Sequence, residues 1–217
     1  MMFRSAYDRK RRRARNTRYA IILTIGFVVL TLLDFWILHL AFDSHHHIEH
    51  HDWYRSLRIQ GFLGTWIAVA IAFFLVDRHW RRGGSVFLAP LASAAAAELL
   101  KLIIGRSRPT ENGQLLEGWY HFRPLFDGFR DGHNLGMPSS HTAVAFAGAI
   151  AVSCHIPRLT PLMIALAVGC AYSRVASGAH FPTDVYVAAI LSWVMVRAFR
   201  ELTRRIHGPE AVPSFNR

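Results

Sequence analysis

The stretch YAIILTIGFVVLTLLDFWILHLAF, Tyr19–Phe42, decides the fold class of this chain. It is long enough to cross the hydrocarbon core of a bilayer, which takes about 20 predominantly apolar residues. Five further apolar blocks follow it, at Leu57–Val76, Ser85–Ile104, Ser139–Ile156, Leu159–Ala179 and Pro182–Phe199. Lipid supplies no hydrogen-bond partners, so each block must satisfy its backbone internally as a helix. We therefore expect an all-α integral membrane bundle of six transmembrane helices.

The blocks divide the chain into three parts. Residues 1–18 form a basic N-terminal segment, residues 19–207 form the six-helix membrane domain, and residues 208–217 form a loose tail. Within the domain, the connection 105–138 is rich in Gly, Pro and aromatic residues. A connection of this length in a compact bundle is typically functional or disordered, and we expect it to carry part of an active site.

The positive charge of the chain predicts its orientation. Of the 25 Lys and Arg residues, seventeen fall on the side that holds both termini when six spans are assumed. The positive-inside rule places that side in the cytoplasm. The basic run RKRRRAR, within 9–15, then reads as a topology signal rather than as a nucleic-acid site. The apolar stretch after it is too long for a signal-peptide core, so we expect no cleaved leader.

Three short stretches carry ionisable groups at the ends of these blocks. They are KLIIGRSRP (Lys101–Pro109), MPSSH (Met137–His141) and SRVASGAHFPTD (Ser173–Asp184). The six-span topology, derived from other basic residues, brings all three to the outer membrane face. Charged groups beside hydrocarbon are costly, at roughly 2.5 to 3.5 kcal/mol each on insertion scales, and are usually functional.

The cations among these stretches predict a phosphate site. Lys101, Arg108 and Arg174 have no matching number of acids nearby in the sequence. Ser139 is a candidate N-cap, which would leave the amides of Ser140 and His141 free to bind an anion. Arginine adds planar donors for phosphate oxygens, and lysine adds a point charge. Taken singly, a cap at Ser139 or a snorkelling Arg174 would each have a purely structural explanation.

The histidines extend this prediction to catalysis. Pro182 is expected at the first position of the last helix, which turns the Asp184 carboxylate back towards the His180 ring. A carboxylate on one ring nitrogen leaves the other free to attack phosphorus. His141 is then the candidate general acid and base. Taken alone, Asp184 would equally suit a first-turn acid that complements the helix dipole.

These residues resemble the signatures of the type 2 phosphatidic acid phosphatases, the membrane branch of a superfamily that includes the vanadium haloperoxidases. The family patterns are a Lys and an Arg-Pro separated by six residues, a Pro-Ser-Gly-His, and a Ser-Arg followed after five residues by His and after three more by Asp. The resemblance implies that His180 forms a phosphohistidine, that Asp184 orients it, and that His141 protonates the leaving group. It implies phosphate binding by Lys101, Arg108, Ser139, Ser140 and Arg174, and no metal or other cofactor. Ser140 departs from the family glycine but keeps the backbone N–H.

The resemblance implies a metal-independent phosphatase that hydrolyses a phosphomonoester or pyrophosphate lipid headgroup. The candidates are undecaprenyl pyrophosphate, phosphatidylglycerophosphate, phosphatidate and the 1-phosphate of lipid A. The short chain points to a bacterial inner membrane, with both termini in the cytoplasm and the site outside. The competing classes are a phospholipid transporter or scramblase that uses the same cations, and a scaffold without activity. The scaffold would be expected to lack His141, His180 or Asp184, and all three are present.

Several other groups stay open at this stage. Glu98 precedes Lys101 by one helical turn and is a candidate partner for it, and Ser173 is a candidate support for Arg174. Asp34 and His39 lie inside the first block, where ionisable groups usually face the bundle interior and pair. The run HHHIEHH, His45–His51, matches no standard zinc spacing, so we expect a solvated loop rather than a metal site. The segment Gly118–Phe126 is either a membrane-interface segment that guides lipid chains or a plain aromatic belt. The cysteines, Cys154 and Cys170, are expected to be buried thiols rather than a disulfide.

Overall fold

The computed structural model describes residues 2–42, 48–77, 80–111, 114–116 and 120–207. Within them the chain is mostly helical. The helices are α1 (Met2–Ala41), α2 (Asp52–Arg58), α3 (Leu63–Asp77), α4 (Trp80–Ile104), α5 (Ser140–His155), α6 (Thr160–Ala176) and α7 (Pro182–His207). Short 3-10 turns occur at η1 (Ile48–His50), η2 (Ile59–Gly61), η3 (Asp127–Phe129) and η4 (Pro157–Leu159). A small antiparallel hairpin, β1 (Thr110–Glu111) with β2 (Gln114–Leu115), lies in the long connection between α4 and α5.

Each apolar block of the sequence contains a helix, but the helices differ in their capacity to cross a bilayer. Among the described residues, three are long and apolar enough, within Arg13–Ala41, Arg82–Ile104 and Pro157–Ala176. A fourth span results if Asp52–Gly61 and Leu63–Val76, which are bent by 69° against each other, count as one. The side chains of α1 fit lipid contact, since Leu32, Trp36 and Leu40 are 64–79% exposed. The model therefore supports a helical membrane protein.

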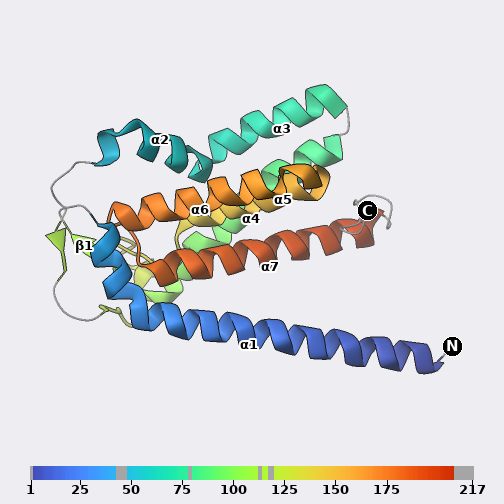
Figure 1. Cartoon of the computed structure of the whole chain (residues 1–217), viewed down its shortest axis with the longest axis horizontal. Helices are drawn as coiled ribbons and strands as arrows, with labels where there is room; N and C mark the ends of the chain where they lie inside the picture. The colour runs from blue at the N-terminus through green and yellow to red at the C-terminus, as the bar shows by residue number, and fades with distance from the viewer. Residues whose placement is uncertain (1, 43–47, 78–79, 112–113, 117–119, 208–217) are drawn as a thin grey trace.

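The helix predicted over Leu57–Val76 is interrupted rather than continuous. The helix stops at η2, and α3 begins only at Leu63. Phe62, between them, has extended backbone torsions (φ −96°, ψ 135°), which no helix can continue through. The break turns α2 away from the axis of α3 and lays it along α6 (Figure 1).

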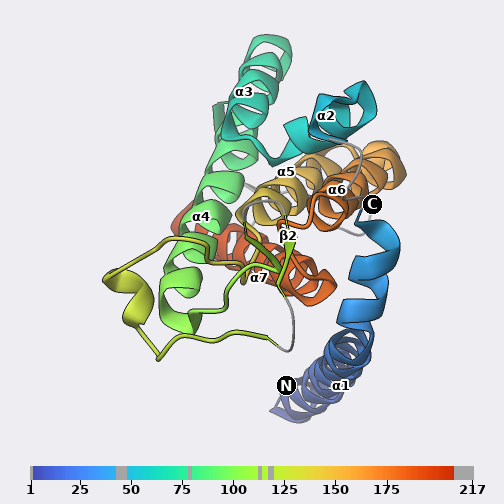
Figure 2. The same cartoon turned by 90° about the vertical axis from the view of Figure 1, so that its left-hand side faces the viewer.

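The bundle is built around α5, which packs against α4, α6 and α7. In Figure 1, α1 begins and α7 ends at the same end of the bundle, whereas the β hairpin lies at the opposite end. Figure 2, which faces that opposite end, shows the connection between α4 and α5 spread across it. The two ends of the molecule are thus chemically different, one with the basic helix termini and one with the long connection.

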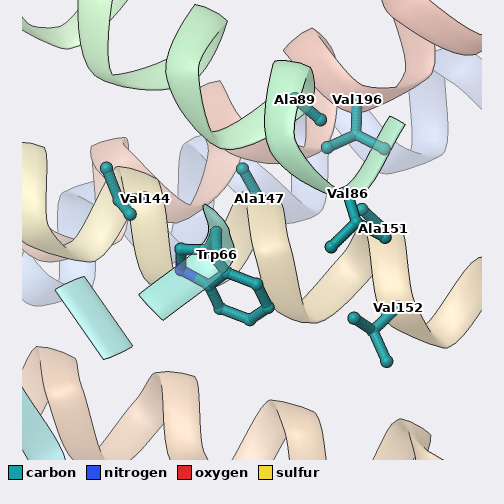
Figure 3. Close-up of a cluster of buried hydrophobic side chains, with 8 residues drawn as sticks. All are labelled: Trp66, Val86, Ala89, Val144, Ala147, Ala151, Val152 and Val196. Carbon is teal, nitrogen blue, oxygen red and sulfur yellow. The ribbon is translucent and has the colours of Figure 1, made fainter. Parts of the chain in front are cut away.

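One buried cluster holds the centre of the bundle together (Figure 3). Trp66 of α3 is 2% exposed and lies among small and branched side chains of α4, α5 and α7. Gly148 makes this contact possible, because a Cβ there would lie 2.2 Å from the Trp66 ring. The indole N–H donates to the Gln60 carbonyl at 2.9 Å, so the tryptophan also ties α3 to η2.

The ends of the helices near the long connection follow the sequence signals. Ser139 caps α5, as predicted, and its hydroxyl oxygen accepts the Thr142 N–H. α4 ends at Ile104, where Gly105 takes a positive φ of 67° and donates its N–H to the Lys101 carbonyl. α7 begins at Pro182, also as predicted. These three helix ends place the charged stretches of the sequence at one end of the bundle.

Candidate active site

Lys101 lies at the C-terminal end of α4 in a three-member polar cluster. Its ammonium donates to Glu98 Oε1 at 2.9 Å and to Ser140 Oγ at 2.5 Å. The Ser140 hydroxyl in turn donates to Glu98. The expected pairing of Glu98 with Lys101 is confirmed. The hydroxyl that replaces the family glycine is therefore engaged with Lys101 and Glu98.

Arg174, in the last turn of α6, is 5% exposed and is held by a residue from the first half of the chain. Its Nη1 donates to the hydroxyl of Tyr54 at 2.8 Å. Tyr54 belongs to α2 and is completely buried. The bent helix pair of α2 and α3 thus contributes to the site, although it lies outside the three charged stretches found in the sequence.

Arg58, at the end of α2, adds a further cation beside Tyr54. Its guanidinium lies 5.8 Å from the Tyr54 ring centroid and 5.4 Å from the Phe62 ring centroid. Phe62 in turn meets the His141 ring edge to face, with centroids 5.1 Å apart. Among the described residues no carboxylate pairs with Arg58, and its Nε is buried without a hydrogen-bond partner. A positive charge therefore stands on the His141 side of the site.

His180 lies within electrostatic reach of the three cations that are predicted to bind phosphate. It lies between α6 and α7 and is 2% exposed. Burial lowers its pKa well below the usual 6.5, and the positive charges of Arg174, Arg108 and Lys101 lower that pKa further. The ring is therefore neutral at physiological pH, with an electron pair available on one nitrogen.

Asp184 faces this ring, as predicted, but not at hydrogen-bond distance. Its Oδ2 lies 3.7 Å from His180 Nδ1 and accepts the Phe181 N–H at 2.9 Å. Its Oδ1 accepts from Nη1 of Arg106 at 3.1 Å. The carboxylate is thus held in place by the backbone and by an arginine, beside the imidazole that it is expected to orient.

His141 lies in the first turn of α5 and packs against Gly61 of η2 and against Phe62. Its Nε2 is buried and has no hydrogen-bond partner among the described residues. A Cβ added at Gly61 would lie 2.7 Å from the His141 Cβ, so the backbone of η2 presses directly on this residue. The ring is fixed by packing, while its Nε2 has no hydrogen-bond partner among the residues that the structure describes.

The remaining predicted residues lie in the same region. The half-buried Arg108 donates through Nε to the Leu135 carbonyl at 3.2 Å. Ser139 is completely buried, and its N–H donates to the Asp184 carbonyl at 3.2 Å, which ties the second stretch to the third. Ser173 donates to the Cys170 carbonyl of its own helix at 2.7 Å, so its hydroxyl serves α6 rather than Arg174.

A small recess opens next to Arg108. Its walls come from α1, from the connection between α4 and α5, and from the turn between α6 and α7. They include Phe35, Leu38, His39, Arg108, Leu115, Leu116, Tyr120, His121 and Phe181. Most of these residues are apolar, and Arg108, one of the cations predicted to bind phosphate, is among them. The recess therefore places an apolar surface next to one of these cations.

Two ionisable residues, Arg106 and His39, behave differently from their sequence interpretation. Arg106, which the sequence places in an external connection, is 3% exposed and pairs with Asp34 and Asp184 at 3.1 Å each. Asp34 is completely buried and paired, as expected for an intramembrane acid, whereas His39 is exposed. The sequence analysis did not identify Arg106 as part of the site, because within KLIIGRSRP only Lys101 and Arg108 match the family pattern. It did not identify Tyr54 or Arg58 either, because neither residue belongs to a recognisable motif.

The other open groups resolve in part. Cys154 and Cys170 are free and buried, as predicted. Tyr120 donates to Asp34 at 2.9 Å, so this member of Gly118–Phe126 faces the bundle, whereas Phe122 and Phe126 are more than half exposed. Gly118 and Trp119, like His45–His47, lie outside the described residues. Among the residues with described positions, no group of three or more His, Cys, Asp or Glu could hold a metal ion.

Comparisons with known proteins find curated relatives that match part of this chain. Phosphatidylglycerophosphatase B of Escherichia coli (strain K12) is 39% identical over 83 residues, which are 36% of this chain and 33% of the relative. Lipid A 1-phosphatase of Rhizobium johnstonii is 33% identical over 105 residues, 48% of this chain and 40% of the relative. The chain thus matches about a third to two fifths of the length of these curated relatives. No solved structure matches it.

The family model described as the PAP2 superfamily matches residues 82–207. That range is more than half of the chain, and it contains α5, α6, most of α4 and the whole of α7. It also contains every residue of the three charged stretches. The chain belongs to the PAP2 superfamily.

Proposed function

We propose that this chain is an integral membrane lipid phosphatase that acts at the extracytoplasmic face through a phosphohistidine on His180. One observation carries the proposal. A buried imidazole lies within electrostatic reach of the positive charges of Arg174, Arg108 and Lys101, which lower its pKa, and a phosphate dianion requires such a group of cations. His141, whose buried Nε2 has no hydrogen-bond partner among the described residues, is the proposed proton donor to the leaving oxygen.

The reaction follows from this placement. Nδ1 of His180 faces Asp184, so the lone pair of Nε2 attacks phosphorus and the bond to the leaving oxygen breaks. His141 donates its proton to that oxygen. The proton donor is the imidazolium form of His141, which becomes neutral in this step. A water then attacks the phosphohistidine while neutral His141 takes up the water proton, which restores the imidazolium, and the P–N electron pair returns to His180. The cations stabilise the charge on the equatorial oxygens of both transition states.

The membrane context supports a lipid as the carrier of the phosphate. The apolar recess adjoins Arg108, so an acyl or prenyl chain can lie against its wall while the headgroup enters the cradle. The two relatives are named for lipid phosphates, phosphatidylglycerophosphate and the 1-phosphate of lipid A. We propose the full six-span arrangement for residues 19–207, with 1–18 and 208–217 in the cytoplasm of a bacterial cell. The basic helix termini, opposite the site in Figure 1, support that orientation.

Arg58 bears on the leaving group. It stands beside Phe62 and therefore on the side of His141, the group that we propose protonates the leaving oxygen. A cation there stabilises a leaving group that itself carries negative charge. Undecaprenyl pyrophosphate and phosphatidylglycerophosphate release such an anion, whereas phosphatidate releases a neutral diacylglycerol. We propose a preference for the first two over phosphatidate.

Phosphate release by the purified protein tests these statements. The four candidate lipids are compared in detergent micelles with excess chelator and no added metal, for the wild type, His180→Ala and Arg58→Gln. We expect metal-free turnover, its loss in His180→Ala, and a larger loss for anionic leaving groups in Arg58→Gln. Turnover of His180→Ala at the wild-type rate would contradict the nucleophile assignment. Equal losses on all four lipids would contradict the role of Arg58.

The competing class, a transporter or scramblase, predicts a different result. Protein reconstituted in vesicles would then move labelled phospholipid between leaflets while releasing no phosphate from any of the four lipids. The neutral, buried His180 within electrostatic reach of three cations favours hydrolysis, because lipid translocation requires no nucleophile. Phosphate release that is lost in His180→Ala separates the two classes.

A further inference from the structure

The first helix contributes a buried carboxylate to the neighbourhood of the site. Asp34 of α1 is completely buried. Its Oδ1 accepts the Thr183 N–H at 2.8 Å, and its Oδ2 accepts from the Thr183 hydroxyl and from Nη2 of Arg106 at 3.1 Å. The Tyr120 hydroxyl donates to the same Oδ2 at 2.9 Å. These donors offset the free-energy cost of burying the carboxylate, which would be very large without them. The position of Asp34 is therefore fixed by the fold.

Arg106 connects this carboxylate to the one that faces His180. Its Nη2 reaches Asp34 and its Nη1 reaches Asp184, both at 3.1 Å. The guanidinium also lies 4.0 Å from the Tyr120 ring centroid and 4.3 Å from that of Phe181. The two rings and two carboxylates leave it little freedom, so Arg106 fixes the distance between the carboxylates on its two sides.

Asp34 also acts on the helix that carries Asp184. Thr183 is the second residue of α7, and its N–H is one of those that a helix leaves unsatisfied at its N-terminus. Asp34 accepts that N–H from a different helix and therefore serves as a cap supplied by α1. The segment from His180 to Asp184 is thus held from outside the range 82–207 that the family model matches.

We propose that Asp34 is a positioning residue for the phosphatase reaction, acting through Arg106 on Asp184 and so on the His180 ring. The inference rests on the proposed function. Arg106 is one cation shared by two carboxylates. When Asp34 loses its charge, Arg106 is attracted to Asp184 alone, and Asp184 shifts relative to the ring that it faces at 3.7 Å. The chemistry at phosphorus then slows, while the phosphate cradle of Lys101 and Arg174 is unchanged.

The test is a double-mutant cycle of Asp34→Asn with Arg106→Gln, measured as kcat and KM on whichever of the four candidate lipids the wild type hydrolyses fastest. Asparagine keeps an oxygen for the Thr183 N–H and removes the charge. We expect kcat of Asp34→Asn to fall about tenfold or more, by the sensitivity of reaction rates to misplacement, with KM within about threefold. In Arg106→Gln two buried carboxylates lack their cation, so Asp34→Asn should raise kcat in that background.

The reversal of sign separates positioning from capping alone. If Asp34 merely capped α7, Asp34→Asn would keep the capping oxygen and change kcat by the same small factor with or without Arg106, and that result would overturn the proposal. If Arg106→Gln does not fold, Arg106→Lys replaces it. A lysine cannot serve both carboxylates in a planar geometry, so Asp34→Asn should cost clearly less there than in the wild type. An equal cost would again overturn the proposal.

The matched control is Asp131→Asn. Asp131 also pairs with an arginine, Arg123, at 3.0 Å, but it is 61% exposed and has no contact with Asp184. We expect wild-type kcat for this variant. The outcomes also distinguish the inference from the proposed function. Activity that is lost in His180→Ala but kept at the wild-type level in Asp34→Asn refutes the inference alone, whereas activity kept in His180→Ala refutes the function.

Discussion

Gly61→Ala should impair the proposed proton donor without changing any ionisable group. Gly61 is buried in η2, and a Cβ there would lie 2.7 Å from Cβ, 2.8 Å from Cδ2 and 3.0 Å from Cα of His141. Ordinary carbon contacts are about 3.5 to 4.0 Å. One of these atoms is backbone, so the conflict cannot be relieved by a rotamer change alone. Either η2 or the first turn of α5 must move by about 1 Å.

A displacement of that size costs roughly a hundredfold in rate for a positioned catalytic group, or about 2.7 kcal/mol. Because His141 is proposed to protonate the leaving oxygen, the loss should depend on the leaving group. We expect a loss of about a hundredfold in kcat for an alkyl lipid phosphate. For an aryl phosphate, whose leaving oxygen needs little protonation, the loss should be a few-fold at most. Phosphate release by purified protein in detergent measures both.

Gly64→Ala is the matched control, because nothing lies within 4 Å of a Cβ at that position and the residue is three positions along the same segment. It should behave as the wild type on both substrates. Equal losses on the alkyl and aryl substrates in Gly61→Ala would show that His141 is not the proton donor. Wild-type rates in Gly61→Ala would refute the close packing of η2 on His141.

Three further predictions concern the other parts of the site. Tyr54→Phe removes the hydroxyl that accepts a hydrogen bond from Arg174 at 2.8 Å. A hydrogen bond to a charged group contributes about 1.5 to 3 kcal/mol, so KM should rise at least tenfold. An unchanged KM would contradict the contact. Ser140→Gly and Ser140→Ala both remove the hydroxyl that Lys101 contacts, and each should raise KM by roughly threefold to tenfold; a glycine variant faster than the wild type would instead show that the serine crowds the site. Because the pKa of His180 is lowered well below 6.5, the ring stays unprotonated as the pH falls through 6.5, and the acid limb of kcat/KM should lie below that value. Lys101→Met removes one of the charges responsible and should move this limb to higher pH, and a limb that does not move would count against the electrostatic effect of Lys101 on His180.

The local geometry at the helix ends of the site could be predicted from sequence because it depends on residue type and spacing. The cap at Ser139, the end of α4 before Gly105 and the start of α7 at Pro182 follow from backbone rules that operate within one turn. The pairing of Glu98 with Lys101 follows from their separation of one helical turn. Each of these signals is complete within a few residues, so no tertiary information is needed.

The apolar blocks alone determined that this is a helical membrane protein, because hydrocarbon accepts no unsatisfied backbone. The pairing of Asp34 with Arg106, the contact of Tyr54 with Arg174 and the break at Phe62 were decided by the tertiary structure. The paired residues are 72 and 120 positions apart. Which buried charge meets which partner across such separations depends on how the helices pack, since any of several carboxylates could have served a given cation. The short-range pattern of a chain fixes what a helix end can bind, and the packing of distant helices decides what is brought to it.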